Sequence, residues 1–460
     1  MKKVICCLIS AFIVLSSFAS CGRNSDSVAS STSSAASANA GVSITLKELS
    51  EPVDTLPTPA RRYFDNVNYN TDDYSSTSVT TYFSSALKPA PVRLSWKYSD
   101  KNKVRSSTVL ISTDKSFKKP ISINVEGNTE NAKVYNLFTG TKYFWKVKST
   151  LSDGKTATSN ISSFTTVDSV RILNIDGVTN VRDMGAWKTA DGKTIKQGVA
   201  YRSAEMDSKD YTKISSEGIK TALDDLGIKT DIDLRTLEEI TNSGSELTAG
   251  PLGSLVKYVH VSSAQYAKYL GSTETDTAVI KQFADLDNYP ILFHCVVGAD
   301  RTGTLAFMIK ALLGVSENDI VKDYELTGTR NRSQPAFAAF IEAFKKLDGD
   351  TFQQKAYNFY HDKCGLTDME LSNILNIFLT DSAVFCSDSL EGPTERDSSK
   401  FSFNLNLRKS KGVKSVTLDG NNVEFSVSGN LLTVKSGSNA GSHKGVITFN
   451  DGNSLSYELK

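Results

Sequence analysis

The middle of the chain alternates short apolar runs with longer segments whose apolar residues recur every three or four positions. Short apolar runs predict buried strands, and the longer periodic segments predict helices. Strands are expected at 199–202, 229–234, 256–261 and 289–293, and helices at 210–226, 275–286, 304–313, 316–327, 335–347, 351–360 and 367–379. Ser316 with Asp319 and Thr367 with Glu370 have the spacing of N-cap pairs. Residues 168–385 are therefore predicted to form one α/β domain with a helical C-terminal half.

The two flanks, residues 45–167 and 386–460, show strand-like alternation interrupted by turn residues every several positions. Because no helical periodicity intervenes, each flank is predicted to be a β-sandwich, which gives a multidomain chain. The expected strands are 92–96, 108–112, 133–137, 140–147 and 163–166 in the first flank, and 401–407, 413–418, 423–427, 431–434, 445–449 and 455–459 in the second. The segment before Pro91, with Tyr63, Tyr69, Tyr74 and Tyr82, is less regular and is expected to supply a first strand or a surface of the first sandwich.

The first twenty residues, 1–20, carry the pattern of an export signal. Two lysines precede an apolar run over residues 4–18, which is shorter than the roughly 20 residues that a membrane span needs. The small residues before Cys21 resemble a bacterial lipobox. Cleavage before Cys21 and lipidation of its thiol are therefore expected to anchor an exported protein to a membrane of the bacterial cell envelope. The alternative is an ordinary secreted protein cut nearby. Residues 21–44 are predicted to be a flexible linker, since they are rich in Ser and Ala.

Composition limits what the protein is expected to bind. The 460 residues carry 52 Lys and Arg against 51 Asp and Glu, a net charge of +1, so no global field attracts nucleic acid. Only four histidines are present and no His/Cys cluster has metal-ligand spacing, so we expect no metal and no other cofactor. Two cysteines, Cys364 and Cys386, remain without an assigned role, and their spacing leaves open whether they form a disulfide.

Residues 294–303, HCVVGADRTG, form a strand-to-helix turn with two glycines. Backbone N–H groups of such a turn, together with the helix N-terminus, make an anion site that suits phosphate. The helix dipole and Arg301 favour the thiolate of Cys295, a strong nucleophile, and Arg301 offers paired donors to two phosphate oxygens. Thr302 is expected to donate its hydroxyl to the sulfur and His294 to orient the loop by a hydrogen bond. The remaining predicted phosphate-binding residues are Val296, Val297, Gly298, Ala299 and Gly303. Together these residues suggest attack on phosphorus and a phosphocysteine intermediate.

These ten residues resemble the signature of cysteine-dependent protein tyrosine phosphatases. The aspartate directly before the arginine, Asp300 before Arg301, makes the signature similar to that of one branch, the atypical bacterial tyrosine and dual-specificity phosphatases. Some members of this branch also hydrolyse phosphoinositides. Three upstream segments are similar to motifs of the same branch, in order and spacing: 180–185 (NVRDMG), 191–203 (DGK through YRS) and 232–239, which contains Asp233, Arg235, Glu238 and Glu239. The resemblance implies a phosphatase domain over about two hundred residues.

The reaction needs an acid to protonate the leaving oxygen and then a base to activate water. Asp300 lies inside the loop, and the resemblance implicates it in catalysis. Asp233 ends a predicted strand that would bring it to the same rim, but an ion pair with Arg235 or Arg182 is its other interpretation. We favour Asp300 and leave Asp233 open. Arg182 and Asp183 are expected to brace the loop as a structural ion pair.

The flanks also resemble known modules. The first is similar to a fibronectin type III module, in which Trp96 would be the core tryptophan and Leu137 with residues 140–143 the tyrosine corner. The second resembles a small Ig-like accessory module of bacterial surface enzymes. The tyrosines before Pro91 are open to two interpretations: binding of a carbohydrate or protein at the surface, or ordinary core and loop aromatics.

We therefore predict an exported phosphatase that hydrolyses phosphomonoesters, either phosphotyrosine and other phosphoproteins or small phosphoesters. The resembled branch often has Lys where this chain has Ala299, and it associates that Lys with phospholipid head groups, so an inositol-phosphate or phosphoinositide substrate is the runner-up. A catalytically silent surface binding protein and a sulfur- or arsenate-handling cysteine enzyme are the alternatives from other classes.

Overall fold

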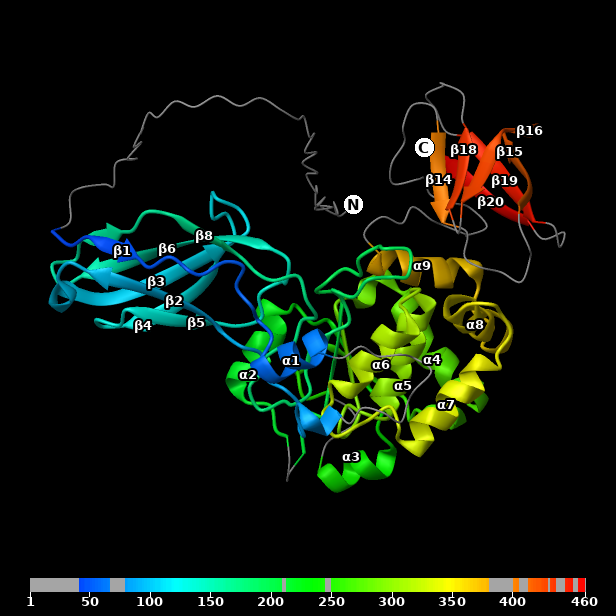
Figure 1. Ribbon diagram of the computed structural model, residues 1–460, viewed down its shortest axis with the longest axis horizontal. Coiled ribbons are helices and arrows are strands. Elements are labelled where there is room, and N and C mark those ends of the chain that lie inside the picture. The colour runs from blue at the N-terminus through cyan, green and yellow to red at the C-terminus, as the bar shows by residue number, and fades with distance from the viewer. Residues whose placement is uncertain are drawn as a thin grey trace, which may run out of the picture.

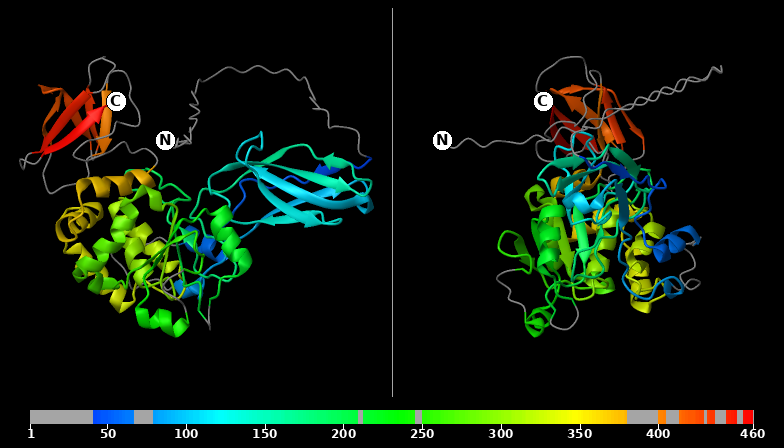
Figure 2. Two further views of the ribbon diagram at one scale, coloured as in Figure 1. Left: turned by 180° about the vertical axis from the view of Figure 1, so that it is seen from behind. Right: turned by 90° about the vertical axis from the view of Figure 1, so that its left-hand side faces the viewer.

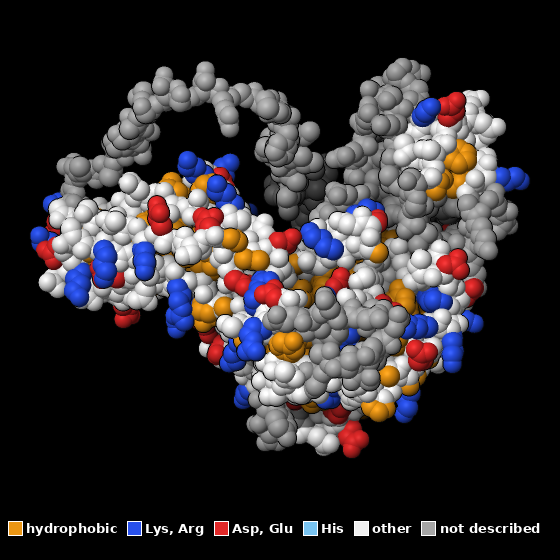
Figure 3. All heavy atoms as spheres, viewed as in Figure 1, with side chains coloured by type: hydrophobic (Ala, Val, Ile, Leu, Met, Phe, Trp, Pro, Cys, Tyr) orange, Lys and Arg blue, Asp and Glu red, His pale blue; other side chains and the backbone are white. Residues whose placement is uncertain are grey.

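The structure, a computed structural model, describes residues 41–66, 79–208, 212–244, 250–379, 400–404, 413–428, 431–435, 443–449 and 454–459. The predicted signal peptide, Cys21, most of the predicted linker and Cys386 lie outside these residues. Figure 1 shows β-rich parts near both ends of the chain and a helix-rich part between them. Within the described ranges, no helix is long and apolar enough to cross a bilayer. On the face shown in Figure 3, positive and negative side chains are intermingled.

Two antiparallel sheets enclose one core in the N-terminal part. One has the strand order β1-β2-β5 and the other β4-β3-β6-β7, with β8 also paired to β6. Their bounds are Ile44–Leu46 (β1), Val92–Tyr98 (β2), Val104–Ser112 (β3), Ile121–Glu126 (β4), Asn131–Val134 (β5), Lys142–Leu151 (β6), Thr156–Thr158 (β7) and Ser162–Thr165 (β8). Trp96 of one sheet and Trp145 of the other lie in the same buried cluster. The hydroxyl of Tyr143 accepts a hydrogen bond from the backbone N–H of Phe138 at 2.8 Å, which fixes the turn before β6.

The helical part of the segment between β1 and β2 packs on the central domain, whereas Leu49 and Val53 of the same segment pack against the sandwich core. It contains α1 (Thr58–Asn66) and the short helix η1 (Val79–Thr81), and Figure 2 shows α1, in blue, beside the central helices. Tyr63 is fully buried among aromatic edges, and its hydroxyl donates to Glu325 of the central domain at 2.5 Å. The stretch before Pro91 supplies β1, the first strand of the sandwich, as one interpretation expected. Tyr63 of the same stretch is instead buried on the central domain, where burial of its aromatic ring stabilises the contact. Tyr69 and Tyr74 lie outside the described residues.

The central domain is built on a five-stranded sheet with the order β12-β11-β13-β10-β9. Four strands are parallel, β10 (Ala200–Ser203), β11 (Thr230–Asp233), β12 (Lys257–His260) and β13 (Ile291–His294), while β9 (Arg182–Asp183) runs antiparallel to β10. Asp233 and Ser203 both pair in register with His294. The carboxyl ends of three neighbouring strands therefore meet at one edge of the sheet, where ligands of such folds are bound.

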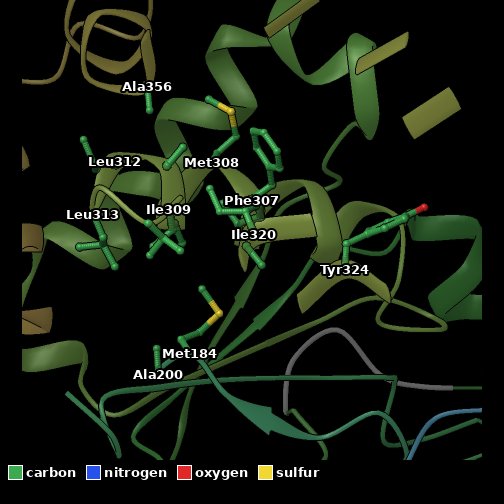
Figure 4. Packing of buried hydrophobic residues seen from close by; sticks show 14 of the residues in the cluster. Met184, Ala200, Phe307, Met308, Ile309, Leu312, Leu313, Ile320, Tyr324 and Ala356 are labelled. Atoms are coloured by element: carbon green, nitrogen blue, oxygen red, sulfur yellow. The ribbon is translucent and has the colours of Figure 1, made fainter. Parts of the chain in front are cut away.

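Helices cover both faces of this sheet. They are α2 (Ser216–Lys220) with the π-helix η3 (Thr221–Asp225), α3 (Leu237–Ser243), η4 (Tyr266–Gly271), α4 (Thr273–Ala284), η5 (Leu286–Asn288), α5 (Arg301–Leu312), α6 (Glu317–Glu325), α7 (Pro335–Lys345), α8 (Phe352–Asn358), η6 (Phe359–Lys363) and α9 (Asp368–Phe378). Ile291 and Phe293 of β13 join the larger buried cluster, whereas Leu292 joins the cluster on the opposite face. Figure 4 shows α5 side chains in one cluster with Ala200 of β10 and with Met184, which directly follows β9. Because α5 is buried from Thr302 to Leu312, its first turn is held rigidly.

Capping residues set the helix boundaries. The predicted N-cap pairs are confirmed: the Ser316 side chain accepts from Asp319 N–H, and Thr367 with Glu370 forms a capping box. The helix predicted from residue 210 begins only at Ser216, because Ser215 is its N-cap and accepts from the backbone of Gly218. The C-terminal part contains two antiparallel sheets, with strand orders β14-β18-β17 and β16-β15-β19-β20. Their bounds are Lys400–Asn404 (β14), Val413–Leu418 (β15), Asn421–Asn422 (β16), Phe425–Ser428 (β17), Leu431–Lys435 (β18), His443–Phe449 (β19) and Ser454–Leu459 (β20).

Candidate active site

The loop between β13 and α5 has the predicted order of strand, turn and helix. Cys295 follows β13 directly, and Arg301 is the first residue of α5. Gly298 has a φ of +70°, and a Cβ at this position would lie 2.3 Å from the carbonyl oxygen of Ser203. Only glycine fits both this left-handed backbone and this close approach. Cys295 is 2% exposed at the floor of the loop, whereas Val297 is 44% exposed at its rim.

Three carbonyl oxygens of the loop accept hydrogen bonds from residues outside the loop. Asn180 Nδ2 donates to the carbonyls of Val297 and Gly298, at 3.0 Å each. Arg202 Nη2 donates to the Gly298 carbonyl at 2.8 Å, and the backbone N–H of Glu205 donates to Val296 O at 3.1 Å. In a trans peptide the C=O and the following N–H point in opposite directions. The N–H groups of residues 297–299 therefore face away from Asn180 and Arg202, and successive amides in this arrangement suit an anion.

A buried charge cluster fixes the side chains that hold the loop carbonyls. The carboxylate of Asp323 on α6 lies 2.9 Å from Arg182 Nε, 2.7 Å from Arg202 Nη1 and 3.1 Å from Lys310 Nζ. Burial opposes ionisation of Asp323, but the three basic groups outweigh it and hold the pKa of this carboxyl well below its ordinary value. Burial lowers the pKa of Lys310 to about 7. The cluster carries more positive than negative charge, so it favours an anion on the nearby loop.

Arg182 and Asp183 have separate roles. Arg182 Nη1 donates to Asn180 Oδ1 at 2.5 Å, so Arg182 orients the amide that holds the loop. Asp183 does not touch the loop: it accepts from Arg171 at 2.7 Å and from the backbone N–H groups of Gly185 and Gly198 at 2.8 Å each. Each of the two residues forms a structural ion pair, Arg182 with Asp323 and Asp183 with Arg171, but they do not pair with each other, and only Arg182 braces the loop. Adjacent strand residues point to opposite faces of a sheet, which separates the two side chains.

The guanidinium of Arg301 is fixed by Glu239 of α3. Arg301 Nη1 lies 2.5 Å from one oxygen of Glu239 and Nη2 lies 2.7 Å from the other. Glu239 is also the third residue of a capping box with Thr236, so its position is determined by the start of α3. Two buried donors at the loop, Arg301 Nε and Thr302 Oγ1, have no hydrogen-bond partner among the described residues. The predicted bond from Thr302 to the sulfur is thus absent here, and both donors are available to an anion.

The sequence suggested that His294 orients the loop by a hydrogen bond, but the structure shows no such bond among the residues that it describes. It is fully buried at the end of β13, with Nε2 3.2 Å from Asp231 and Nδ1 4.0 Å from Asp233. Burial alone would lower the pKa of His294, but the carboxylates of Asp233 and Asp231 raise it to about 9. The imidazole is therefore protonated at neutral pH and neutralises the carboxylates at the strand ends.

The raised pKa of His294 gives a direct prediction for solution. Its ring resonance should titrate near pH 9, against the 6.5 of an unperturbed histidine. The ion pair should stabilise the folded state fully below about pH 6.5, and this contribution should be lost as the pH rises through about 9. Carbon-detected NMR titration of the four histidines checks this, with the signal assigned by its loss in His294→Gln. A midpoint near pH 6.5 for this residue would contradict the buried ion pair.

Both predicted acid candidates are ion-paired in the structure. Asp233 is fully buried, bonded to Arg235 Nη2 at 2.7 Å and to the Tyr258 hydroxyl at 2.8 Å. Burial raises the pKa of Asp233, but His294 and Arg235 hold it well below its ordinary value. Asp300 lies at the loop rim, where Arg330 donates Nε and Nη2 to its two oxygens at 2.8 Å each. Its partial exposure makes Asp300 the better placed of the two to meet a leaving group.

Several residues of the site were not predicted individually. Asn180 and Arg202 lie within the two motifs at 180–185 and 191–203, so their involvement was detectable there. Asp323 and Arg330 lie well after the loop in the sequence and belong to no local motif. They reach the site only through the packing of α6 and of the segment that follows it. Among residues covered by the structure, no group of three or more His, Cys, Asp or Glu side chains could hold a metal ion.

Comparison with known proteins shows what the central domain is similar to. The model of the tyrosine phosphatase family matches residues 173–379. A Cupriavidus necator protein provisionally named a tyrosine-protein phosphatase is 25% identical over 183 residues, and the tyrosine-protein phosphatase of Nostoc commune is 28% identical over 134 residues. These matches cover 35% and 25% of this chain, and the chain spans 64% and 46% of the lengths of those relatives. The family match and both names support a phosphatase hydrolase.

Among solved structures, the core catalytic domain of the PP-IP phosphatase Siw14 from S. cerevisiae, in complex with citrate, is 22% identical with a TM-score of 0.24. That alignment covers 32% of this chain and 83% of the yeast domain. The family match begins where the N-terminal sheets end and stops at the end of α9. The sheets on either side lie outside the residues that the family model matches.

Proposed function

We propose that the chain is a cysteine-dependent phosphatase that hydrolyses phosphomonoesters of proteins, phosphotyrosine above all, through a phosphocysteine intermediate. One observation carries the proposal: the loop carbonyls are held outward by Asn180, Arg202 and the Glu205 backbone, which turns the loop amides toward the front of Cys295. Amides converging on a sulfur beside a fixed guanidinium are suited to bind and attack a phosphoryl group. The family match over residues 173–379 supports the same reaction class.

In the first step the loop amides bind the phosphoryl oxygens, and the thiolate of Cys295 attacks phosphorus. An S–P bond forms while the ester P–O bond breaks, and the leaving oxygen takes a proton from an acid, for which Asp300 is the candidate. Arg301 Nε is a buried donor without a partner among the described residues, so it is available to one phosphoryl oxygen. Because Glu239 accepts hydrogen bonds from both Nη atoms, it fixes the direction in which that Nε–H points.

In the second step a water molecule attacks the phosphocysteine. The carboxylate formed in the first step takes the water proton, the S–P bond breaks, and inorganic phosphate and the Cys295 thiolate are released. We assign the stabilisation of the departing thiolate to the hydroxyl of Thr302, a buried donor on the first turn of α5 that has no partner among the described residues. No cofactor takes part in either step.

The Glu239 anchor gives a prediction of intermediate size. Glu239→Gln keeps the shape of the side chain but removes the charge that orients Arg301, so kcat/KM for p-nitrophenyl phosphate should fall about 10- to 100-fold. Steady-state kinetics measures this. Glu238→Gln, at the exposed neighbouring position, is the matched control and should stay within about twofold of wild type. Equal losses in both variants would show that Glu239 does not position Arg301.

A substrate panel tests the proposed specificity. The full chain should dephosphorylate phosphotyrosine peptides with a higher kcat/KM than inositol phosphates, because Ala299 is buried in the loop and adds no positive charge there. Phosphate release from each substrate at equal concentration measures the preference. Faster release from inositol phosphates would replace phosphoprotein by the runner-up substrate class, and no release from any phosphomonoester would leave only a phosphate-binding role.

We also propose that the phosphatase is exported and anchored by lipid on Cys21, and that the flanking sheets are fibronectin type III-like and Ig-like modules that position the enzyme or bind a surface ligand. The signal pattern in residues 1–20 supports export. The shared core around Trp96 and the bond of Tyr143 to Phe138 support the fibronectin-like assignment. Labelling with a fatty-acid analogue should mark the wild-type chain and not Cys21→Ala; equal labelling of both would overturn the anchor.

A further inference from the structure

The segment after α6 places a second arginine at the rim of the candidate active site. Arg330 lies between α6 and α7 and binds Asp300 with a two-pronged contact, Nε to one oxygen and Nη2 to the other, at 2.8 Å each. The Arg330 side chain is 23% exposed and that of Asp300 is 21% exposed. The pair thus lies where the loop meets solvent, and a bound substrate can reach it.

This contact conflicts with the acid role of Asp300. A carboxyl group that donates a proton must carry that proton on one oxygen, but here both oxygens accept from Arg330, and the hydroxyl of Tyr266 is also bonded to the carboxylate. Burial raises the pKa of Asp300, and the bonds from Arg330 and Tyr266 outweigh it and lower the pKa. Asp300 can therefore act as an acid only after Arg330 has moved away from at least one oxygen.

The backbone on both sides of Arg330 is fixed, so only its side chain is free to move. Gly328 has a φ of +79°, and a Cβ there would lie 2.3 Å from the carbonyl oxygen of Ser85. Arg332 is fully buried and binds both oxygens of Glu325, at 3.0 and 2.9 Å. The guanidinium of Arg330 is therefore carried by a rigid segment beside the loop. Among the described residues, its Nη1 makes one long contact, 3.4 Å to the Thr329 carbonyl.

We propose that Arg330 is a specificity-determining residue that moves from Asp300 to a second anionic group of the substrate, a carboxylate adjacent to the phosphotyrosine of a peptide. A carboxylate offers a guanidinium the same paired contact that Asp300 now provides. The exchange binds the acidic peptide and at the same time frees an oxygen of Asp300 to take up the proton that the leaving group needs. This inference rests on the proposed function and refines its substrate class.

The test compares two phosphotyrosine peptides that differ only by Glu or Gln next to the phosphotyrosine. With the full chain, we expect kcat/KM to be about tenfold higher for the Glu peptide. In Arg330→Met this preference should fall to about one, and in Arg330→Lys part of it should remain, because Lys keeps the charge without the paired donors. Arg93→Met, at an exposed position on β2, is the matched control and should keep the wild-type preference.

Each outcome decides the inference. Loss of the Glu preference in Arg330→Met with partial rescue by Arg330→Lys supports it. A preference that survives in Arg330→Met, or a wild-type enzyme that cleaves both peptides equally, overturns it while leaving the phosphatase assignment intact. If the wild-type chain cleaves neither peptide and no aryl phosphate, the proposed function fails instead. Should Arg330→Met not fold, the wild-type and Arg330→Lys ratios still decide, since equal ratios in these two proteins contradict the paired contact.

Discussion

Replacing Cys295 by Ser should lower turnover of any phosphomonoester by about 10⁴-fold or more, because a serine hydroxyl at this position is a far weaker nucleophile than a thiolate. The loop amides and Arg301 remain in Cys295→Ser, so the variant should still bind inorganic phosphate. Steady-state kinetics on p-nitrophenyl phosphate measures the loss of turnover, and calorimetric titration with phosphate measures retained binding.

The second described cysteine provides the matched control. Cys364 is a free, buried cysteine at the end of η6, and burial raises the pKa of its thiol to about 12, so it is not a thiolate at neutral pH. Cys364→Ala should therefore retain turnover. Whether Cys364 pairs with Cys386 stays open, since Cys386 lies outside the described residues. Turnover that persists in Cys295→Ser, or that is lost equally in Cys364→Ala, would contradict the assignment of the nucleophile.

Replacing Asp323 by Asn should destabilise the fold by about 3–5 kcal/mol, the usual consequence of removing one partner from a buried charge cluster. Arg182 and Arg202 would lose their shared counter-ion while remaining buried. Phosphate binding should weaken as well, because Arg202 also holds the Gly298 carbonyl and Arg182 orients Asn180. This is the largest stability effect that we expect from a single conservative substitution near the loop.

Urea unfolding at neutral pH measures this effect. The depressed pKa of Asp323 means that its contribution is present above about pH 4, the unfolded value, and is lost as the pH falls through the folded value. Asp319→Asn on the same helix is the control: its carboxylate is about one-third exposed and should change the free energy of unfolding by less than about 1 kcal/mol. A similar small change in Asp323→Asn would show that the cluster does not hold the domain together.

The sequence was sufficient to predict the loop and its immediate setting. The apolar run before Cys295 and the helix from Arg301 follow from local periodicity, and the N-caps at Ser316 and Thr367 follow from residue spacing. Gly298 was identified with the loop, although its close approach to Ser203 required the structure. These features depend on residues that are near one another in the chain.

The features that could not be predicted depend on long-range packing. Asp323 reaches Arg182 and Arg202 only because α6 folds back over the sheet. Tyr63 joins the central core from a segment that lies between two strands of the first sandwich. His294 looked like a loop-orienting residue, but the register of β11 and β13 places it between two carboxylates. Asp183 turns away from the loop because the strand pleat directs it opposite to Arg182.

In the proposed reaction the phosphoryl group passes through the sulfur of Cys295, and a rapid-quench experiment can detect it there. The full chain is mixed with an aryl phosphate, stopped with acid within the first turnover, digested and analysed by mass spectrometry. We expect a phosphoryl group on the peptide that contains Cys295, formed together with a burst of the released phenol. A burst with the phosphoryl group on another residue, or steady turnover with no phosphorylated peptide while Cys295→Ser remains active, would contradict it.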